Sequence, residues 1–253
     1  MRSGNFGYWL AGILLGLVAG FTLANSFYRA QLQAVNLNVE QAVPNLVQPK
    51  GEVGTANSNP DQLNLSDEEL HQAIARADNN PEDLQLQRKL GLSLYRYAVL
   101  EQQSGILPDV IRILKRAEQD SLQKDSELFV TLGDALLVLG REGESQKIIE
   151  ARSFYQKALQ VEPKNADFFV GLGLTYLLAE PSNPSQALIQ FQQALQLNSR
   201  HERALGNVVA AYLALKKDKE AADNLERLRQ LNPQSTVLKD LQIQISQRQI
   251  SEK

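Results

Sequence analysis

Apolar residues recur at intervals of three and four positions along most of the chain after residue 65, and short polar turns divide these runs. Such spacing is typical of amphipathic helices that bury one face. Within the runs a sparser pattern repeats: an aromatic residue, a Leu-Gly pair and an apolar residue in one helix, then Ala, aromatic and Ala in the next. The clearest copy consists of Phe169, Leu172, Gly173, Tyr176, Ala187, Phe191 and Ala194.

Three further copies keep this spacing. The second consists of Phe129, Leu132, Gly133, Leu136, Ala151, Tyr155 and Ala158, and the last of Leu205, Val208, Val209, Tyr212, Ala221, Leu225 and Leu228. The first copy fits more loosely, because Gln87 takes its aromatic position beside Leu90, Gly91, Leu94, Leu114 and Ala117. The pattern resembles that of the tetratricopeptide repeat (TPR) family, in which pairs of helices stack side by side.

This resemblance implies an all-α fold, a TPR-type α-solenoid of about four helix pairs with capping helices, in a TPR domain at 65–253. The expected repeats cover about 84–122, 126–163, 166–199 and 202–235, and the expected capping helices cover about 66–77 and 236–250. Ser66 and Glu69 form a capping box that opens the first capping helix. In the last one, the alternation of Leu241, Ile243 and Ile245 also suits a strand, but the chain offers no partner strand.

The glycines of the repeated pattern have an expected steric purpose. We expect Gly133 and Gly173 where the two helices of a pair cross closely, since glycine leaves no side chain between them. The aromatic residues are expected to fill the gaps between units, and Phe191 is the clearest of them.

Residues 1–29 predict a single transmembrane helix. From Phe6 to Ala24 the chain has no charged residue, and about 20 apolar residues cross the hydrocarbon of a bilayer. A cleaved signal peptide, with Thr22-Leu23-Ala24 as its cleavage site, is the alternative. The apolar run exceeds the usual length of about 7–15 residues in a signal peptide, which favours a retained anchor. Residues 30–64, rich in Gln and Asn and interrupted by Pro, are expected to form a flexible linker.

Four small residues, Gly12, Gly16, Gly20 and Ala24, recur every four positions along the expected span. Small residues at this spacing let two membrane helices approach closely, so they predict self-association or contact with a partner's span. Arg2 and the α-amine precede the span, and this slight excess of positive charge favours a cytoplasmic amino terminus. The repeats would then lie on the periplasmic side of a bacterial inner membrane.

Composition argues against catalysis, bound cofactors and nucleic-acid binding. The net charge is −3, which provides no basic footprint for nucleic acid. Cysteine is absent from the sequence, and the two histidines, His71 and His201, belong to no metal or triad spacing. His201 follows Arg200 in a polar turn and is expected to be solvated. We therefore expect no catalytic residue, no metal site and no cofactor.

The resemblance places the first helix of each pair along a concave groove that receives peptides or helices of partner proteins. On the family's register the groove residues are Arg88, Lys89, Tyr95, Arg96, Val130, Asp134, Leu137, Val170, Leu174, Leu177, Leu178, Asn207 and Leu213. They form an apolar surface with a basic amino-terminal end, which suits an amphipathic helix. The Lys and Asn of the family's carboxylate clamp are not matched. The alternative is that these residues pack within the solenoid, or against the linker or the closing helix.

Two functional classes remain open. The first is a membrane-tethered adaptor that holds a protein partner during envelope assembly, and its layout resembles that of the membrane-anchored TPR proteins of cytochrome c maturation. The second is a permanent structural subunit of a larger membrane complex. An enzyme that carries TPR repeats is disfavoured, because no second domain is left unassigned.

Overall fold

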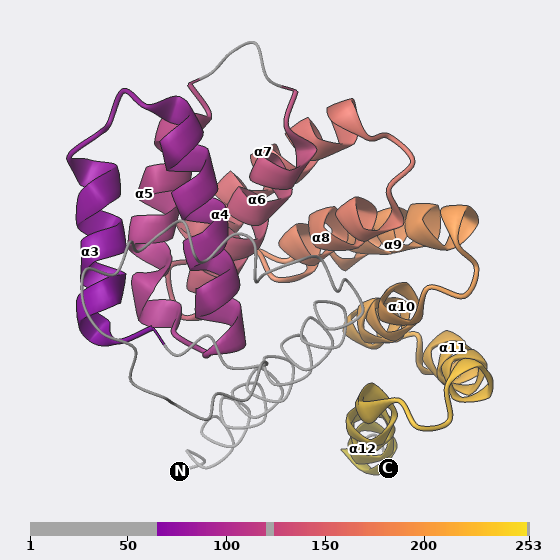
Figure 1. The fold of residues 1–253 in the computed structure, drawn as a ribbon. Helices are drawn as coiled ribbons and strands as arrows, with labels where there is room; N and C mark the ends of the chain where they lie inside the picture. Colours follow the sequence, from indigo (N-terminus) through magenta and orange to yellow (C-terminus); the bar gives the residue numbers. More distant parts are fainter. Residues whose placement is uncertain (1–64, 120–123, 252–253) are drawn as a thin grey trace, which may run out of the picture. The chain divides into compact units, whose positions relative to one another are not determined.

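The computed structural model describes residues 65–119 and 124–251, and this part of the chain contains ten α-helices, one short 3₁₀-helix and no strand (Figure 1). The helices are α3 (Asp67–Asp78), α4 (Leu84–Leu100), α5 (Leu107–Ala117), α6 (Ser126–Arg141), α7 (Gln146–Val161), α8 (Ala166–Leu177), α9 (Pro184–Leu197), α10 (Glu202–Ala214), α11 (Asp218–Leu231) and α12 (Thr236–Ser251). The expected all-α fold is confirmed for these residues.

The expected membrane span, its stripe Gly12, Gly16, Gly20 and Ala24, and the linker lie outside the described residues. Within the part that the structure describes, every helix is too short or too polar to cross a bilayer.

The helices form two compact units, one within residues 29–161 and one that includes residues 162–253. In the first unit, α4 packs along α5 and α6 along α7, while α6 also contacts both α4 and α5. The second unit repeats this arrangement: α8 packs along α9 and α10 along α11, and α10 contacts both α8 and α9. Within each unit, the first helix of the leading pair therefore touches its own partner and the first helix of the following pair, which is the packing of a helical solenoid.

Polar side chains mark where the helices begin. Ser66 and Glu69 form the expected capping box at α3, in which the Ser66 hydroxyl accepts from the Glu69 N–H and the Glu69 carboxylate accepts from the Ser66 N–H. Single N-cap side chains begin five further helices; they are Asp83, Asp125, Asn165, Asn183 and His201.

A glycine on the first helix of a pair faces a large side chain on the second helix. A methyl group added at Gly173 would overlap the ring of Phe191, and one added at Gly133 would lie 3.2 Å from the ring of Tyr155. Gly91 stands in the same relation to Leu114, whose Cδ2 atom would be 2.5 Å away. The rings of Phe191 and Tyr155 are almost fully buried. The prediction that Gly133 and Gly173 sit at close helix crossings is confirmed.

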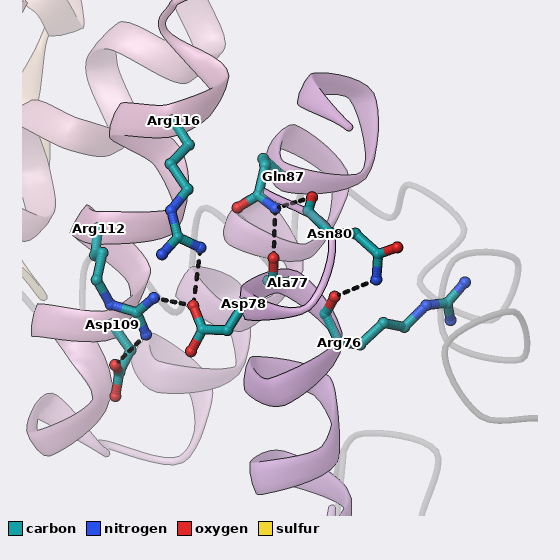
Figure 2. A network of polar contacts seen from close by, with 8 residues as sticks. All are labelled: Arg76, Ala77, Asp78, Asn80, Gln87, Asp109, Arg112 and Arg116. Atoms are coloured by element: carbon teal, nitrogen blue, oxygen red, sulfur yellow. Dashed lines mark hydrogen bonds and ion pairs between the residues drawn. The ribbon is translucent and has the colours of Figure 1, made fainter. Parts of the chain in front are cut away.

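The first pair departs from the aromatic pattern at Gln87, for a reason visible in the structure. This side chain is fully buried, and its Nε2 donates to the carbonyl oxygens of Ala77 at 2.7 Å and Asn80 at 2.8 Å (Figure 2). The carbonyls at the end of a helix lack partners within that helix. Gln87 therefore fixes the end of α3 against α4, which an aromatic ring at this position would not do.

The closing segment is a helix, as expected, rather than a strand. Leu238, Leu241 and Ile245 are buried against α10 and α11, whereas Ile243 is exposed. The buried positions are spaced by three and four residues, which is the helical period. The alternation of Leu241, Ile243 and Ile245 therefore does not form a strand.

We predict that Phe191→Ala strongly lowers the thermal midpoint of unfolding. The ring is fully buried in the cluster formed by α8, α9 and α10, and truncating a buried Phe costs roughly 3–5 kcal/mol. Differential scanning calorimetry would measure the change. A midpoint equal to that of the wild type would show that the ring does not hold this pair of helices together.

Candidate functional site

The residues predicted for partner binding lie on the first helices of the pairs. In the first unit α4 carries Arg88, Lys89, Tyr95 and Arg96, and α6 carries Val130, Asp134 and Leu137. In the second unit α8 and its C-cap carry Val170, Leu174, Leu177 and Leu178, and α10 carries Asn207 and Leu213.

These residues divide by burial. Val170 has no exposed surface and packs with Phe191, Ala204 and Val208 in the core between α8, α9 and α10. Tyr95, Leu137 and Leu213 are also buried. Those four side chains serve packing in this structure. Leu174 and Leu177 of α8 and Leu178 at its C-cap are half-buried, and Leu174 and Leu177 also pack against the core between α8, α9 and α10.

Acidic residues of α6 hold the two arginines expected at the basic end of the surface. The Arg88 guanidinium binds both oxygens of Asp125 and lies 2.8 Å from Glu127. Arg96 donates to the other oxygen of Glu127 at 2.8 Å. The positive charge expected on this surface is therefore balanced by the chain itself, and Lys89 is the exposed cation that remains of the three.

Asp125 joins two roles, because it caps α6 and pairs with α4. Its Oδ1 accepts the Leu128 N–H at 3.0 Å, while its side chain is only 12% exposed. Burial alone would raise the pKa of this carboxyl, but the hydrogen bonds from Arg88 and the Leu128 N–H outweigh burial and hold the pKa below its ordinary value of 3.8. The hydrogen bond to Asp125 in turn raises the pKa of Arg88.

In the second unit, Asp167 at the start of α8 is the acidic residue that binds the beginning of α10. Arg203 donates to its carboxylate at 2.9 Å, and the His201 Nε2 lies 3.3 Å from the same oxygen. The His201 Nδ1 accepts the Ala204 N–H at 3.3 Å and so caps α10. With Nδ1 an acceptor, Nε2 carries the hydrogen that faces Asp167. The prediction of a solvated His201 is wrong, because capping buries the ring to 11% exposure.

Ion pairs also join the second helices of the pairs in the first unit to one another and to α3. Asp78 at the end of α3 accepts from both Arg112 and Arg116 of α5 (Figure 2). Further along, Lys157 of α7 pairs with Glu118, and Glu150 of α7 pairs with Lys115. The hydrogen bond from Arg112 is the main cause that holds the pKa of Asp78 below its ordinary value.

The geometry offers little chemistry beyond these pairs. The Asp134 carboxylate, expected at the surface of α6, accepts the hydroxyl of the buried Tyr155. Among the described residues no three side chains of the His, Cys, Asp and Glu types gather as metal ligands would. Most charged residues of the first helices bind neighbouring helices. The half-buried residues of α8 and its C-cap, Leu174, Leu177 and Leu178, are aliphatic.

We predict that Asp125→Asn lowers stability near neutral pH by about 1 kcal/mol, because Asn keeps the cap but loses the charge that holds Arg88. The folded-state pKa of Asp125 is depressed, so its contribution is fully present above pH 3.8 and disappears as the pH falls through the folded-state pKa. Urea unfolding of both proteins at several pH values would measure the difference.

Asp83→Asn is the matched control, since Asp83 caps α4 through the Leu86 N–H. This change should alter stability far less. A stability difference for Asp125→Asn that stays constant into strong acid would contradict the assignment of an ion pair.

No protein-family model and no curated protein sequence matches the chain. Solved structures do match it. The crystal structure of TTC0263, a thermophilic TPR protein in Thermus thermophilus, is 19% identical over 73% of this chain and 90% of that chain, with a TM-score of 0.52. The crystal structure of MamA is 19% identical over 65% of this chain and 87% of that chain, with a TM-score of 0.51. Together with the helix packing, these similarities show that the chain has a TPR-type fold, an α-solenoid of paired helices.

Proposed function

We propose that this chain is a non-catalytic, membrane-tethered scaffold that binds a protein partner or a partner's helix on the first helices of its pairs. The observation that carries the proposal is the aliphatic strip of α8. This strip consists of Leu174, Leu177 and Leu178, which are half-buried; Leu174 and Leu177 lie against the core with part of their surface still exposed. Aliphatic side chains that folding leaves partly in water gain stability when a partner covers them.

The charge distribution supports an apolar mode of recognition. Arg88, Arg96 and Arg203 are engaged by carboxylates of neighbouring helices. A partner that ended in an acidic peptide would have to displace these pairs, whereas the aliphatic face of an amphipathic helix would not. Helix-in-groove recognition of this kind uses apolar anchors at intervals of three and four residues.

The proposal includes a membrane tether and a location of the repeats on one side of the membrane. The uncharged run from Phe6 to Ala24 supports a single-pass anchor, and the amino-terminal charge supports repeats on the periplasmic side. A tether concentrates the binding face near the membrane, which favours partners that are themselves membrane-bound. This layout suits an adaptor of envelope protein assembly, such as the maturation of cytochrome c.

A permanent structural subunit of a larger membrane complex is the second candidate, and the stripe of Gly12, Gly16, Gly20 and Ala24 favours it. That stripe would give the chain a second interface within the bilayer. Purification of the full-length chain in mild detergent separates the two candidates. A stoichiometric complex that survives high salt supports the subunit, and a substoichiometric set of bound proteins supports the adaptor.

We predict that Leu174→Arg together with Leu178→Arg abolishes partner capture while leaving the helical content unchanged. Two charges on the aliphatic strip would have to be buried under any partner, which is costly without a counter-charge. Affinity purification from membranes with the full-length chain, followed by quantitative mass spectrometry, would measure capture. Circular dichroism would measure helical content.

The matched control is Ile149→Arg together with Ile243→Arg. These two residues are exposed on α7 and α12, so the control adds the same charge on helices other than α8. Capture should survive in the control. Equal loss in both variants, or full capture by the Leu174→Arg, Leu178→Arg variant, would refute binding on α8.

A further inference from the structure

The first described helix, α3, has the residue spacing of a second helix of a pair. In the four described pairs, the second helix carries three core residues spaced by four and then three positions. These residues are, for example, Ala187, Phe191 and Ala194 in α9, and Leu70, Ile74 and Ala77 keep the same spacing in α3. α3 also contacts α4, the first helix of the following pair, as α5 contacts α6 and α9 contacts α10. Among the described residues, however, no helix precedes α3.

The middle residue of this spacing normally packs against the first helix of its own pair. In α5, α7 and α9 it is Leu114, Tyr155 or Phe191, which fills the space beside a glycine of the first helix. These three side chains, and Leu225 at the same position of α11, are buried. Ile74, the middle residue of α3, is only half-buried. The exposed part of Ile74 is therefore expected on the side that a first helix covers in the other pairs.

On its other side α3 is fixed to the following pair. Leu70 and Ala77 are buried, and the side chain of Gln87 on α4 donates to the Ala77 carbonyl oxygen (Figure 2). Asp78 accepts from two arginines of α5, one of which is Arg112. These contacts hold α3 in the place of a second helix. What α3 lacks, within the described part of the chain, is the first helix of its own pair.

The chain before α3 contains a segment with the pattern of an amphipathic helix. Within residues 30–43, apolar residues recur at positions i, i+3, i+7, i+10 and i+11, which fall on one helix face; they are Leu32, Val35, Val39, Ala42 and Val43. Pro44 follows directly, and a helix commonly ends before a proline. The alternation of Val35, Leu37 and Val39 also suits a strand, but the described residues contain no strand with which it could pair.

We propose that residues 30–43 form the first helix that pairs with α3, with their apolar face against Ile74. In every described pair the first helix precedes the second in the chain, as this segment precedes α3. Residues 44–64 would connect the two helices. This connection would exceed the connection 178–183 between α8 and α9, but the free-energy cost of closing a loop grows only slowly with its length.

The pairing would make the first part of the expected linker a part of the fold. Residues 30–43 directly follow the expected membrane span, so their docking would hold the first pairs of helices beside the bilayer. Partners at the membrane surface would then meet the repeats at a higher effective concentration than on a longer free tether. This consequence rests on the proposed anchor, whereas the pairing of residues 30–43 with α3 depends neither on the anchor nor on binding at α8.

Hydrogen–deuterium exchange of the full-length chain in mild detergent, read by mass spectrometry, tests the pairing. We expect the amides of residues 30–43 to be protected, and the protection to be independent of protein concentration, because the contact lies within one chain. Val35→Asp together with Val39→Asp places two charges on the apolar face. This variant should raise the exchange rate of the α3 amides about tenfold, since α3 then loses the apolar contacts of its partner helix.

The matched control for this variant is Gln33→Asp together with Gln41→Asp. These changes add the same charge to the opposite face of the proposed helix. Exchange of the α3 amides should then equal that of the wild type. All four substitutions lie before residue 65, so any effect on α3 reports on its contact with the segment.

Substitutions on α3 give the reciprocal test. Ile74→Lys should release residues 30–43 and raise their exchange, whereas Ala75→Lys, at an exposed position of the same helix, should not. Exchange of the α6 and α7 amides would show whether the helical fold is retained. If Ile74→Lys also loosens α6 and α7, the comparison of the two Asp variants decides.

Three results would overturn the proposal. Unchanged exchange of α3 in the Val35→Asp, Val39→Asp variant would mean that the segment does not cover Ile74, even if detergent protects it. Protection that disappears on dilution would show that a second copy of the chain is the occupant. Residues 30–43 that exchange freely in the wild type would show that they form no helix on α3.

Discussion

The close crossing of the two helices in each pair is the constraint on which this structure depends. In three pairs a glycine of the first helix leaves room for a large side chain of the second: Gly91 for Leu114, Gly133 for Tyr155 and Gly173 for Phe191. Because the glycine removes a side chain from the contact, the buried residue fills the space that the crossing leaves and excludes water. The two helices of each of these three pairs therefore pack closely as one unit, and units of this kind stack on their neighbours.

Stacking is then set by contacts between equivalent helices. Ion pairs join first helix to first helix, as between Arg88 and Asp125 or Arg203 and Asp167, and second helix to second helix, as between Lys157 and Glu118. Half-exposed ion pairs of this kind contribute little stability individually, but they fix which residues lie opposite one another. Their consequence for function is that most charged groups of the first helices are already engaged. The side chains of α8 and its C-cap that remain half-buried, Leu174, Leu177 and Leu178, are aliphatic.

The features that recur in the helix pairs could be predicted from the sequence. The individual contacts between residues far apart in the chain could not. The positions of Gly133, Gly173 and Phe191 followed from a spacing that recurs, because the same steric problem recurs in every pair. The pairing of Arg88 with Asp125 spans 37 residues and follows no period, although an acid at the N-cap of the next first helix is a signal that points to it. The solvated His201 was a wrong prediction, and the role of Gln87 was not predicted, for a related reason: each side chain binds backbone groups at the end of a helix, and a periodic pattern describes helix faces rather than helix ends. Of the predicted binding residues, burial separated Val170 from Leu174, which the register alone had treated alike.

The role of these glycines is tested most directly by a double-mutant cycle between Gly173→Ala and Phe191→Ala, measured by chemical denaturation. If the glycine is present to admit the aromatic ring, the added methyl group should cost much less stability once the ring has been removed. We expect a favourable coupling of about 1 kcal/mol or more between the two changes, as for other residues in direct contact. Equal costs of Gly173→Ala in the wild-type and Phe191→Ala proteins would contradict this role, because the glycine and the ring would then act independently.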